Sequence, residues 1–430
     1  MQRLATSDPD FEARFARIVG DRRESGEDVA RAVQSILAEV RARGDEALAE
    51  YTLRLDKHRL AQDEGWHIGP ERCAEAFEGL EPRARKALEL AATRIRAYHQ
   101  EQLPRNRDFT DAVGARLGAR WSPVDAAGLY VPGGRAAYPS SLLMNAIPAK
   151  VAGVGRLVVA TPTPQGQVNE LVLAAAHIAQ VDEVWRVGGA QAIAALAYGT
   201  DRIAPVDVVT GPGNAWVAEA KRQLYGVVGI DMVAGPSEIL VISDNKSDPD
   251  WIAADLLSQA EHDPSSQSIL ITDDASFAGQ VEDAIDLQLM RLATARTARA
   301  SWDEHGVIII VGDLAAEAPA LADRLAAEHV ELAVDDPQAL FDRIRHAGSV
   351  FLGRLTPEAV GDYVAGPNHV LPTGRRARFA SGLSVLDFMK RTSFLSVDAG
   401  ALAAIGPAAV ALAELEGLPA HARSVELRLT

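Results

Sequence analysis

The chain has 430 residues, of which 48% are hydrophobic and 24% charged, an ordinary globular mixture that can bury a large core. Its formal net charge of −16 argues against nucleic acid or an anionic membrane as the main partner. The single cysteine, Cys73, excludes an intrachain disulfide and favours a reducing compartment. The chain opens without a signal-peptide core, and the apolar tract 399–413 is too short to span a bilayer. We therefore expect a soluble, cytoplasmic protein.

Residues 1 to about 120 are predicted to be mostly helical. The segments 28–37 and 84–91 both carry apolar stripes above charged faces, the pattern of helices that cover a core. Cys73 lies in such a segment with no histidine or basic cluster beside it, so we expect a packed thiol rather than a reactive one.

From about residue 128 short apolar strands alternate with helix-length amphipathic segments. This alternation is typical of βαβ units in parallel sheets. The predicted strands are residues 156–160, 183–187, 206–210, 238–242, 268–271, 306–311 and 349–352. They fit either one wide sheet or two domains, and we favour two, divided near Gly235-Pro236. After about Ser384 the chain is predicted to be helical again.

The predicted fold class is therefore α/β, with two Rossmann-like, doubly wound parallel-sheet domains and helical extensions at both ends. The expected division is an N-terminal helical arm over 1–25, one α/β domain over 26–129 and 237–383, a second over 130–236, and a C-terminal helical tail over 384–430.

Three predicted turns between strand and helix carry glycines, at 130–135, 187–191 and 210–216. Ligands of open α/β sheets bind beyond the carboxyl ends of strands, where glycine admits a bulky group and a helix N-terminus holds phosphate. None of the turns is a G-x-G-x-x-G fingerprint, although Asp231 lies where a ribose-binding acid is expected after Gly211. The turns fit a nucleotide or another phosphate-bearing ligand, with ordinary tight turns as the alternative.

A second group of motifs contains metal-binding and proton-transferring residue types. Gln259 and His262 are three apart, so they share one face of a predicted helix. Glu328 and His329 are adjacent near the end of another predicted helix and are candidates for a general acid/base pair. Further candidates are Asp362, His369, Glu416 and His421.

Nitrogen and oxygen ligands for a divalent metal, zinc by ligand type, are available in Gln259, His262, Asp362 and His421. Spacing alone does not show that these residues converge. The alternative is that each histidine caps a helix or lies in a polar rim.

Taken together, these stretches resemble the histidinol dehydrogenase family over nearly the whole chain from about residue 25. The motifs that carry the resemblance are 128–134, 138–145, 187–192, 211–214, 229–232, 234–238, 258–262, 328–329, 366–369 and Glu416-x4-His421. Ala327 stands where many relatives have proline, which affects only the start of the turn before Glu328.

The resemblance implies a zinc-dependent, NAD-linked, four-electron oxidation of L-histidinol through L-histidinaldehyde to L-histidine, the last step of histidine biosynthesis. It implies zinc ligands at Gln259, His262, Asp362 and His421, the last supplied by the partner subunit of a homodimer with a shared active site. NAD would contact Tyr130, Gln191 and Asn214. The substrate would contact Ser237, Gln259, His262, His329, Asp362, Glu416 and His421.

For the chemistry, His329 would take the hydroxyl proton as hydride leaves. Glu328 would activate water for the aldehyde step, because the one thiol lies in the N-terminal helical region. A paralogous zinc and NAD enzyme that oxidises another alcohol, such as a sulfonated diol, is the nearest alternative. A zinc hydrolase is a second, opposed by the absence of H-E-x-x-H spacing, and a non-catalytic binding module is a third.

Overall fold

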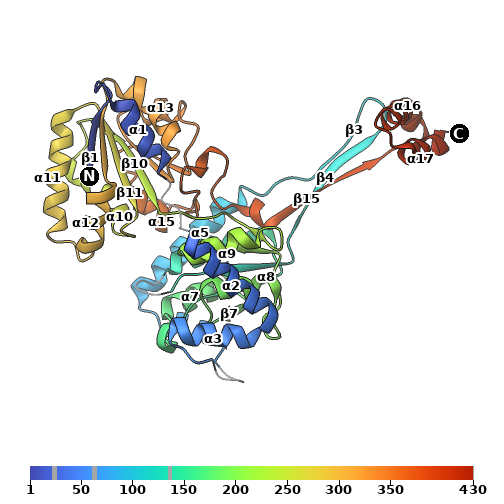
Figure 1. The fold of residues 1–430 in the computed structure, drawn as a ribbon, viewed down its shortest axis with the longest axis horizontal. Coiled ribbons are helices and arrows are strands. Elements are labelled where there is room, and N and C mark those ends of the chain that lie inside the picture. Colours follow the sequence, from blue (N-terminus) through green and yellow to red (C-terminus); the bar gives the residue numbers. More distant parts are fainter. Residues whose placement is uncertain (22–26, 61–64, 134–137, 430) are drawn as a thin grey trace.

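Two lobes and a projecting arm make up the molecule (Figure 1). The computed structural model describes residues 1–21, 27–60, 65–133 and 138–429, so Gly134 and Arg135 of the first glycine turn lie outside the described residues. Each lobe is built on a six-stranded sheet with helices on both faces. The predicted α/β class with two doubly wound sheets is confirmed.

The first sheet is entirely parallel. In spatial order its strands are β1 (Gln2–Ala5), β12 (Val307–Ile310), β11 (Gln267–Thr272), β10 (Glu238–Ser243), β13 (His329–Ala333) and β14 (Ser349–Leu352). Helices α1 (Phe11–Gly20) and α13 (Leu314–Leu325) pack on one face, and α10 (Pro249–Ala260), α11 (Ala275–Leu289) and α12 (Ala295–His305) on the other. Because both faces are covered, β10, β11 and β12 read as continuous apolar runs.

The second sheet is parallel except at its β2 edge. Its strands, in order, are β2 (His67–Ile68), β7 (Glu183–Trp185), β6 (Arg156–Ala160), β5 (Ala126–Tyr130), β8 (Val208–Thr210) and β9 (Gly229–Ile230). One core contains α4 (Pro70–Glu78), α5 (Pro82–Gln100), α6 (Pro139–Ala152) and α7 (Glu170–Ile178). The other contains α2 (Glu27–Arg43), α3 (Asp45–Asp56), α8 (Gly189–Tyr198) and α9 (Ala215–Leu224).

The arm is an antiparallel ribbon that carries two helices at its far end (Figure 1). Its strands are β3 (Arg107–Thr110), β4 (Arg116–Pro123) and β15 (Met389–Ser396), and its helices are α16 (Ala399–Leu415) and α17 (Pro419–Leu429). The prediction that the chain is helical throughout after Ser384 was therefore wrong for β15. That strand pairs with residues more than 260 positions earlier, a contact that no local pattern reports.

The sheets also divide the chain differently from the predicted boundaries. Residues 1–21 do not form the predicted helical arm, because β1 is the edge strand of the first sheet and α1 packs on that sheet. Helices α2 to α5 and strand β5 belong with the second sheet rather than with residues 237–383, because α2 packs on α8 and α9, and β5 is a central strand of that sheet. Their apolar side chains are thus buried in the two cores of the second lobe.

The Glu328-His329 pair does not end a helix. Helix α13 stops at Leu325, Ala326 takes a left-handed conformation with φ 44°, and His329 is the first residue of β13. The pair therefore lies at the amino edge of the first sheet. Among the described residues, no helix is long and apolar enough to cross a membrane.

Candidate active site

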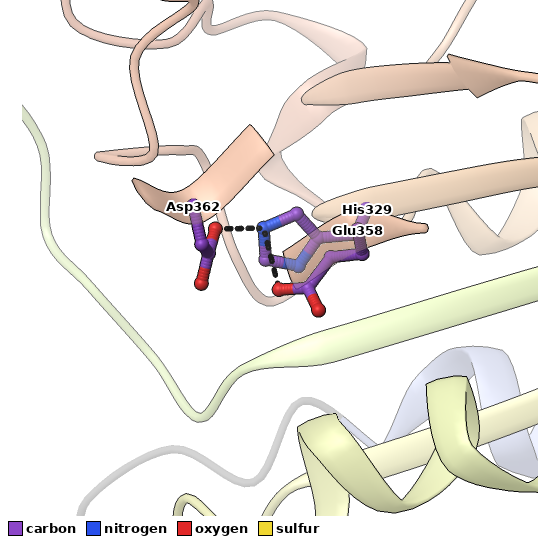
Figure 2. Close-up of side chains that lie close together, drawn as sticks. All are labelled: His329, Glu358 and Asp362. Carbon is purple, nitrogen blue, oxygen red and sulfur yellow. Dashed lines mark ion pairs between the residues drawn. The ribbon is translucent and has the colours of Figure 1, made fainter. Parts of the chain in front are cut away.

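His329 is the centre of a buried polar cluster at the amino edge of the first sheet. Its Nε2 atom lies 3.6 Å from Oδ1 of Asp362 and 3.8 Å from Oε1 of Glu358, and both acids belong to the short helix α15 (Glu358–Tyr363) (Figure 2). Its Nδ1 atom lies 3.0 Å from Oε1 of Gln259 and 3.2 Å from the carbonyl oxygen of Glu238. Since both partners of Nδ1 are acceptors, the network assigns the ring proton to Nδ1 and leaves Nε2 to accept a second proton.

Glu328 lies on the other side of the imidazole. Its Oε2 accepts a hydrogen bond of 3.0 Å from the main-chain N–H of Glu238 and is 3.9 Å from Nδ1 of His329. Burial raises the pKa of the Glu328 carboxyl to about 7. A carboxyl group whose pKa lies near neutral pH is suited to accept a proton from water or an alcohol.

Burial works to lower the pKa of His329, but the charges of Glu328, Asp362 and Glu358 outweigh it and raise that pKa to about 10. Burial also acts against the ionised form of Asp362, yet the neighbouring His329 holds its pKa well below the usual range. Burial raises the pKa of Glu358 to about 8. One buried imidazole thus faces three carboxyl groups.

Glu358 was missed by the sequence analysis. It is four residues before Asp362 on α15, so the two share a helix face, and this spacing is the signal that would have found it. Its second oxygen accepts a hydrogen bond of 3.1 Å from Ser258 Oγ, at the end of α10.

The donors at this edge fit a divalent cation. Nε2 of His329 and Oε1 of Glu358 are buried without a hydrogen-bond partner in the described part of the chain, and His329, Glu358 and Asp362 each offer one ligand atom within 4.8 Å of the others. Nitrogen and carboxylate ligands suit zinc, and a cation would offset the surplus of negative charge. Two of the ligands expected from sequence lie next to His329: Gln259 is 3.0 Å from its Nδ1, and Asp362 is 3.6 Å from its Nε2.

His262 follows the end of α10 and is exposed, one turn beyond Gln259. His369 lies beside Asp362, since its Nδ1 is 2.9 Å from the main-chain oxygen of that residue. Ser237 directly precedes β10, where its carbonyl accepts a hydrogen bond from the N–H of Gln267. His262 and Ser237 therefore belong to segments that border the cluster around His329.

Glu416 and His421 are exposed at the far end of the arm, one after α16 and the other in α17 (Figure 1). Within a single chain they do not approach His329. Their expected roles as substrate contact and metal ligand stay predictions.

The three residues expected to contact NAD gather at the carboxyl edge of the second sheet. Tyr130 ends β5, Gln191 is in the first turn of α8, and Asn214 is the N-cap of α9. The main-chain N–H of Gly189 donates to Tyr130 Oη at 3.1 Å, and a Cβ on Gly211 would lie 2.2 Å from the Tyr130 carbonyl oxygen. The chain runs from β5 to β6 on one side and returns to β8 on the other, which is where nucleotides bind such sheets.

A polar atom without a partner supports a ligand at this edge. Gln191 is buried, and its Oε1 has no hydrogen-bond partner among the described residues. Asn214 already uses its oxygen to accept from the N–H groups of Trp216 and Val217, so only its amide N–H₂ is left for a ligand. The donors and the glycine-lined backbone fit a dinucleotide.

Asp231 does not serve as a ribose-binding acid. Its carboxylate accepts from the N–H of Gly211 at 2.9 Å and pairs with Lys221, and both side chains are buried. Lys221 also donates to the carbonyl oxygen of Gly211 at 3.0 Å. The buried pair therefore holds the Gly211 turn, where φ is 113°.

Glu331, two residues after His329 on β13, gives a pH-dependent prediction. Burial, then the charges of Asp255 and Glu358, raise its pKa from 4.5 to about 9. The folded state thus favours the neutral acid, and the stability this provides is present below pH 4.5 and is lost as the pH rises towards about 9.

Glu331→Gln keeps a neutral side chain at every pH, so we expect its Tm to exceed that of the wild type at pH 8 and the difference to shrink at pH 5. Thermal unfolding at the two pH values measures this, with exposed Glu304→Gln as the control. A difference that is the same at both pH values would contradict the expectation.

Comparisons with known proteins agree with the geometry. The family model described as histidinol dehydrogenase matches residues 20–429. A histidinol dehydrogenase of Zymomonas mobilis is 62% identical over 427 residues, 99% of each chain, and one of Rhodospirillum rubrum is 61% identical over 427 residues, 99% of this chain and 98% of that one. The crystal structure of histidinol dehydrogenase from Elizabethkingia anophelis superposes with a TM-score of 0.93 at 32% identity, covering 100% of this chain and 98% of that one. The full-length match leaves no support for the zinc hydrolase alternative, and the chain belongs to the histidinol dehydrogenase family.

Proposed function

We propose that this chain oxidises L-histidinol to L-histidine through the aldehyde, with NAD and zinc, at the amino edge of the first sheet. The observation that carries the proposal is the buried imidazole of His329 among Glu328, Glu358 and Asp362, in a chain of this family. A cytoplasmic location is part of the proposal, supported by the single, buried cysteine.

The residues proposed to bind the substrate are Ser237, Gln259, His262, His329, Asp362, Glu416 and His421. Gln259, His262, Asp362 and His421 would hold zinc, which would supply a fixed anchor for the substrate. Tyr130, Gln191 and Asn214 would hold NAD, which would supply the hydride acceptor for each oxidation.

Proton transfer falls to the chain's own residues. His329 would accept the hydroxyl proton at Nε2, the nitrogen that faces the carboxylates of α15, because Nδ1 is engaged by Gln259 and Glu238. A cation bound beside Asp362 would lower the pKa of His329, which, against the effect of burial, the surrounding carboxylates raise to about 10, and would so leave Nε2 free to take the proton. Glu328 takes a proton from the water that adds to the aldehyde, a role supported by its pKa of about 7.

A thiol route to the acid is not available. Cys73 is buried in α4, in the second lobe, and burial raises the pKa of its thiol to about 11. This agrees with its expected role as a packed thiol. Water activated by Glu328 is therefore the nucleophile we propose for the second oxidation.

The exposure of apolar side chains on α16 and α17 supports our proposal of a homodimer with a shared site. Among the described residues of α16 and α17, only Ala401, Gly406 and Ala422 are buried, while Leu415 is 85% exposed. Two helices with so little burial need a further surface to cover their apolar side chains. If the arm of one subunit reaches the other, Glu416 and His421 would complete the partner's site.

The first test counts NADH formed per histidine produced from L-histidinol, with and without a chelator. Two NADH per histidine, lost on chelation and restored by zinc, are expected because each oxidation passes one hydride to NAD. An absence of NADH from folded, zinc-loaded protein would point to a paralogue, and other alcohols would be screened next.

Glu328→Gln should separate the two oxidations. The amide cannot take the proton of water, so we expect the aldehyde step to slow by about 10²–10⁴-fold while the alcohol step is largely kept. Single-turnover measurements with histidinol and with histidinaldehyde compare the steps. Equal loss of both would count against the division of roles between Glu328 and His329.

Subunit mixing tests the shared site. His421→Ala and Glu328→Gln should each be nearly inactive as homodimers in the full reaction. A heterodimer of the two would contain one site that keeps His421 from one subunit and Glu328 from the other, so activity should return after unfolding and refolding the mixture. As a control, each variant is unfolded and refolded alone. If each active site is formed by the residues of a single chain, no mixture of the two variants will recover activity.

A further inference from the structure

Both residues of the proposed acid/base pair contact the main chain of one residue, Glu238. The N–H of Glu238 donates to Oε2 of Glu328 at 3.0 Å, and its carbonyl oxygen lies 3.2 Å from Nδ1 of His329. Glu238 is the first residue of β10, beside the start of β13. The position of this residue therefore sets where the two side chains stand.

The side chain of Glu238 is anchored by Arg375. Nη1 of Arg375 lies 3.1 Å from Oε1 of Glu238, and the two side chains are 2% and 1% exposed. Nη2 of Arg375 donates to Oε1 of Gln267 at 2.7 Å and to the carbonyl oxygen of Ile18 at 3.2 Å. Gln267 is the register partner of Glu238 on β11, so one guanidinium joins β10, β11 and the end of α1.

The backbone of Arg375 is itself in an uncommon conformation. Its φ is +67°, in the left-handed region that residues other than glycine seldom adopt. Such a conformation persists where the surroundings fix it, and it is found at functional sites more often than elsewhere. Here the buried contacts of the guanidinium hold it.

We propose that Arg375 is a positioning residue, which acts through Glu238 to fix Glu328 and His329 for proton transfer. The inference rests on the function proposed above. Two buried opposite charges keep each other in place, because separating them would leave a charge without a partner in a medium of low dielectric. The peptide group that holds the acid/base pair is thereby immobilised, and a shift of about 1 Å in such groups can reduce a rate by about 10²-fold.

The test compares Arg375→Met, Arg375→Lys and the double variant Arg375→Met/Glu238→Gln with the wild type. For Arg375→Met we expect kcat to fall by about tenfold to a hundredfold, with KM for NAD and zinc content unchanged. Lysine restores the charge without the planar fork that spans three partners, so Arg375→Lys should recover kcat only in part.

The double variant separates positioning from stability. It removes both buried charges, so Tm should recover towards the wild-type value, while kcat should stay low because Glu238 is no longer anchored. The matched control is Arg354→Met, which breaks ion pairs with Asp244 and Asp335 at the opposite edge of the same sheet. It should lower Tm at most and leave kcat unchanged.

Wild-type kcat in Arg375→Met, or recovery of kcat together with Tm in the double variant, would overturn the proposal and leave the ion pair a purely structural role. If Arg375→Met does not fold, the double variant decides alone by the same criterion. A wild-type protein that makes no NADH from histidinol would instead count against the proposed function.

Discussion

The burial of charge at the amino edge of the first sheet is the constraint on which the site depends. Strand β13, helix α15 and the start of β10 bury four ionisable side chains, those of His329, Glu328, Glu358 and Asp362. A buried ionised group must be paired with an opposite charge or hydrogen-bonded. This pairing is incomplete, since Nε2 of His329 and Oε1 of Glu358 have no hydrogen-bond partner among the residues that the structure describes. A buried site with nitrogen and carboxylate ligands that lack partners is suited to bind a cation.

The two lobes present opposite edges of their sheets. Tyr130, Gln191 and Asn214 lie beyond the carboxyl ends of β5, β7 and β8, whereas His329 stands at the amino end of β13. Binding at a carboxyl edge follows from glycine turns and helix N-termini. At the amino edge of the first sheet the contacts come instead from the first residue of a strand, since the main-chain N–H and C=O of Glu238 contact Glu328 and His329.

The arm extends this organisation beyond one chain. The ribbon of β3, β4 and β15 carries α16 and α17 away from both lobes, and these helices bury few of their apolar side chains (Figure 1). Glu416 and His421 are carried with them. A site divided between two chains would make assembly a condition for activity, since α16 and α17 lie far from both lobes of their own chain (Figure 1).

Local pattern determined the α/β class, most strands of both sheets, and the residue types for proton transfer and metal binding, because periodicity and turn glycines are properties of a few neighbouring residues. It did not determine β13, which follows a left-handed Ala326, or the pairing of β15 with β4, or the place of β1 at the edge of the first sheet. Arg375 was also outside its reach, since its partners Glu238 and Gln267 lie more than a hundred residues away, whereas Glu358 could have been found by its spacing from Asp362. Those contacts form only when distant segments pack together in the folded sheets. Long-range packing buries these polar groups and so determines which of them must pair, and the neighbouring residues in the sequence do not.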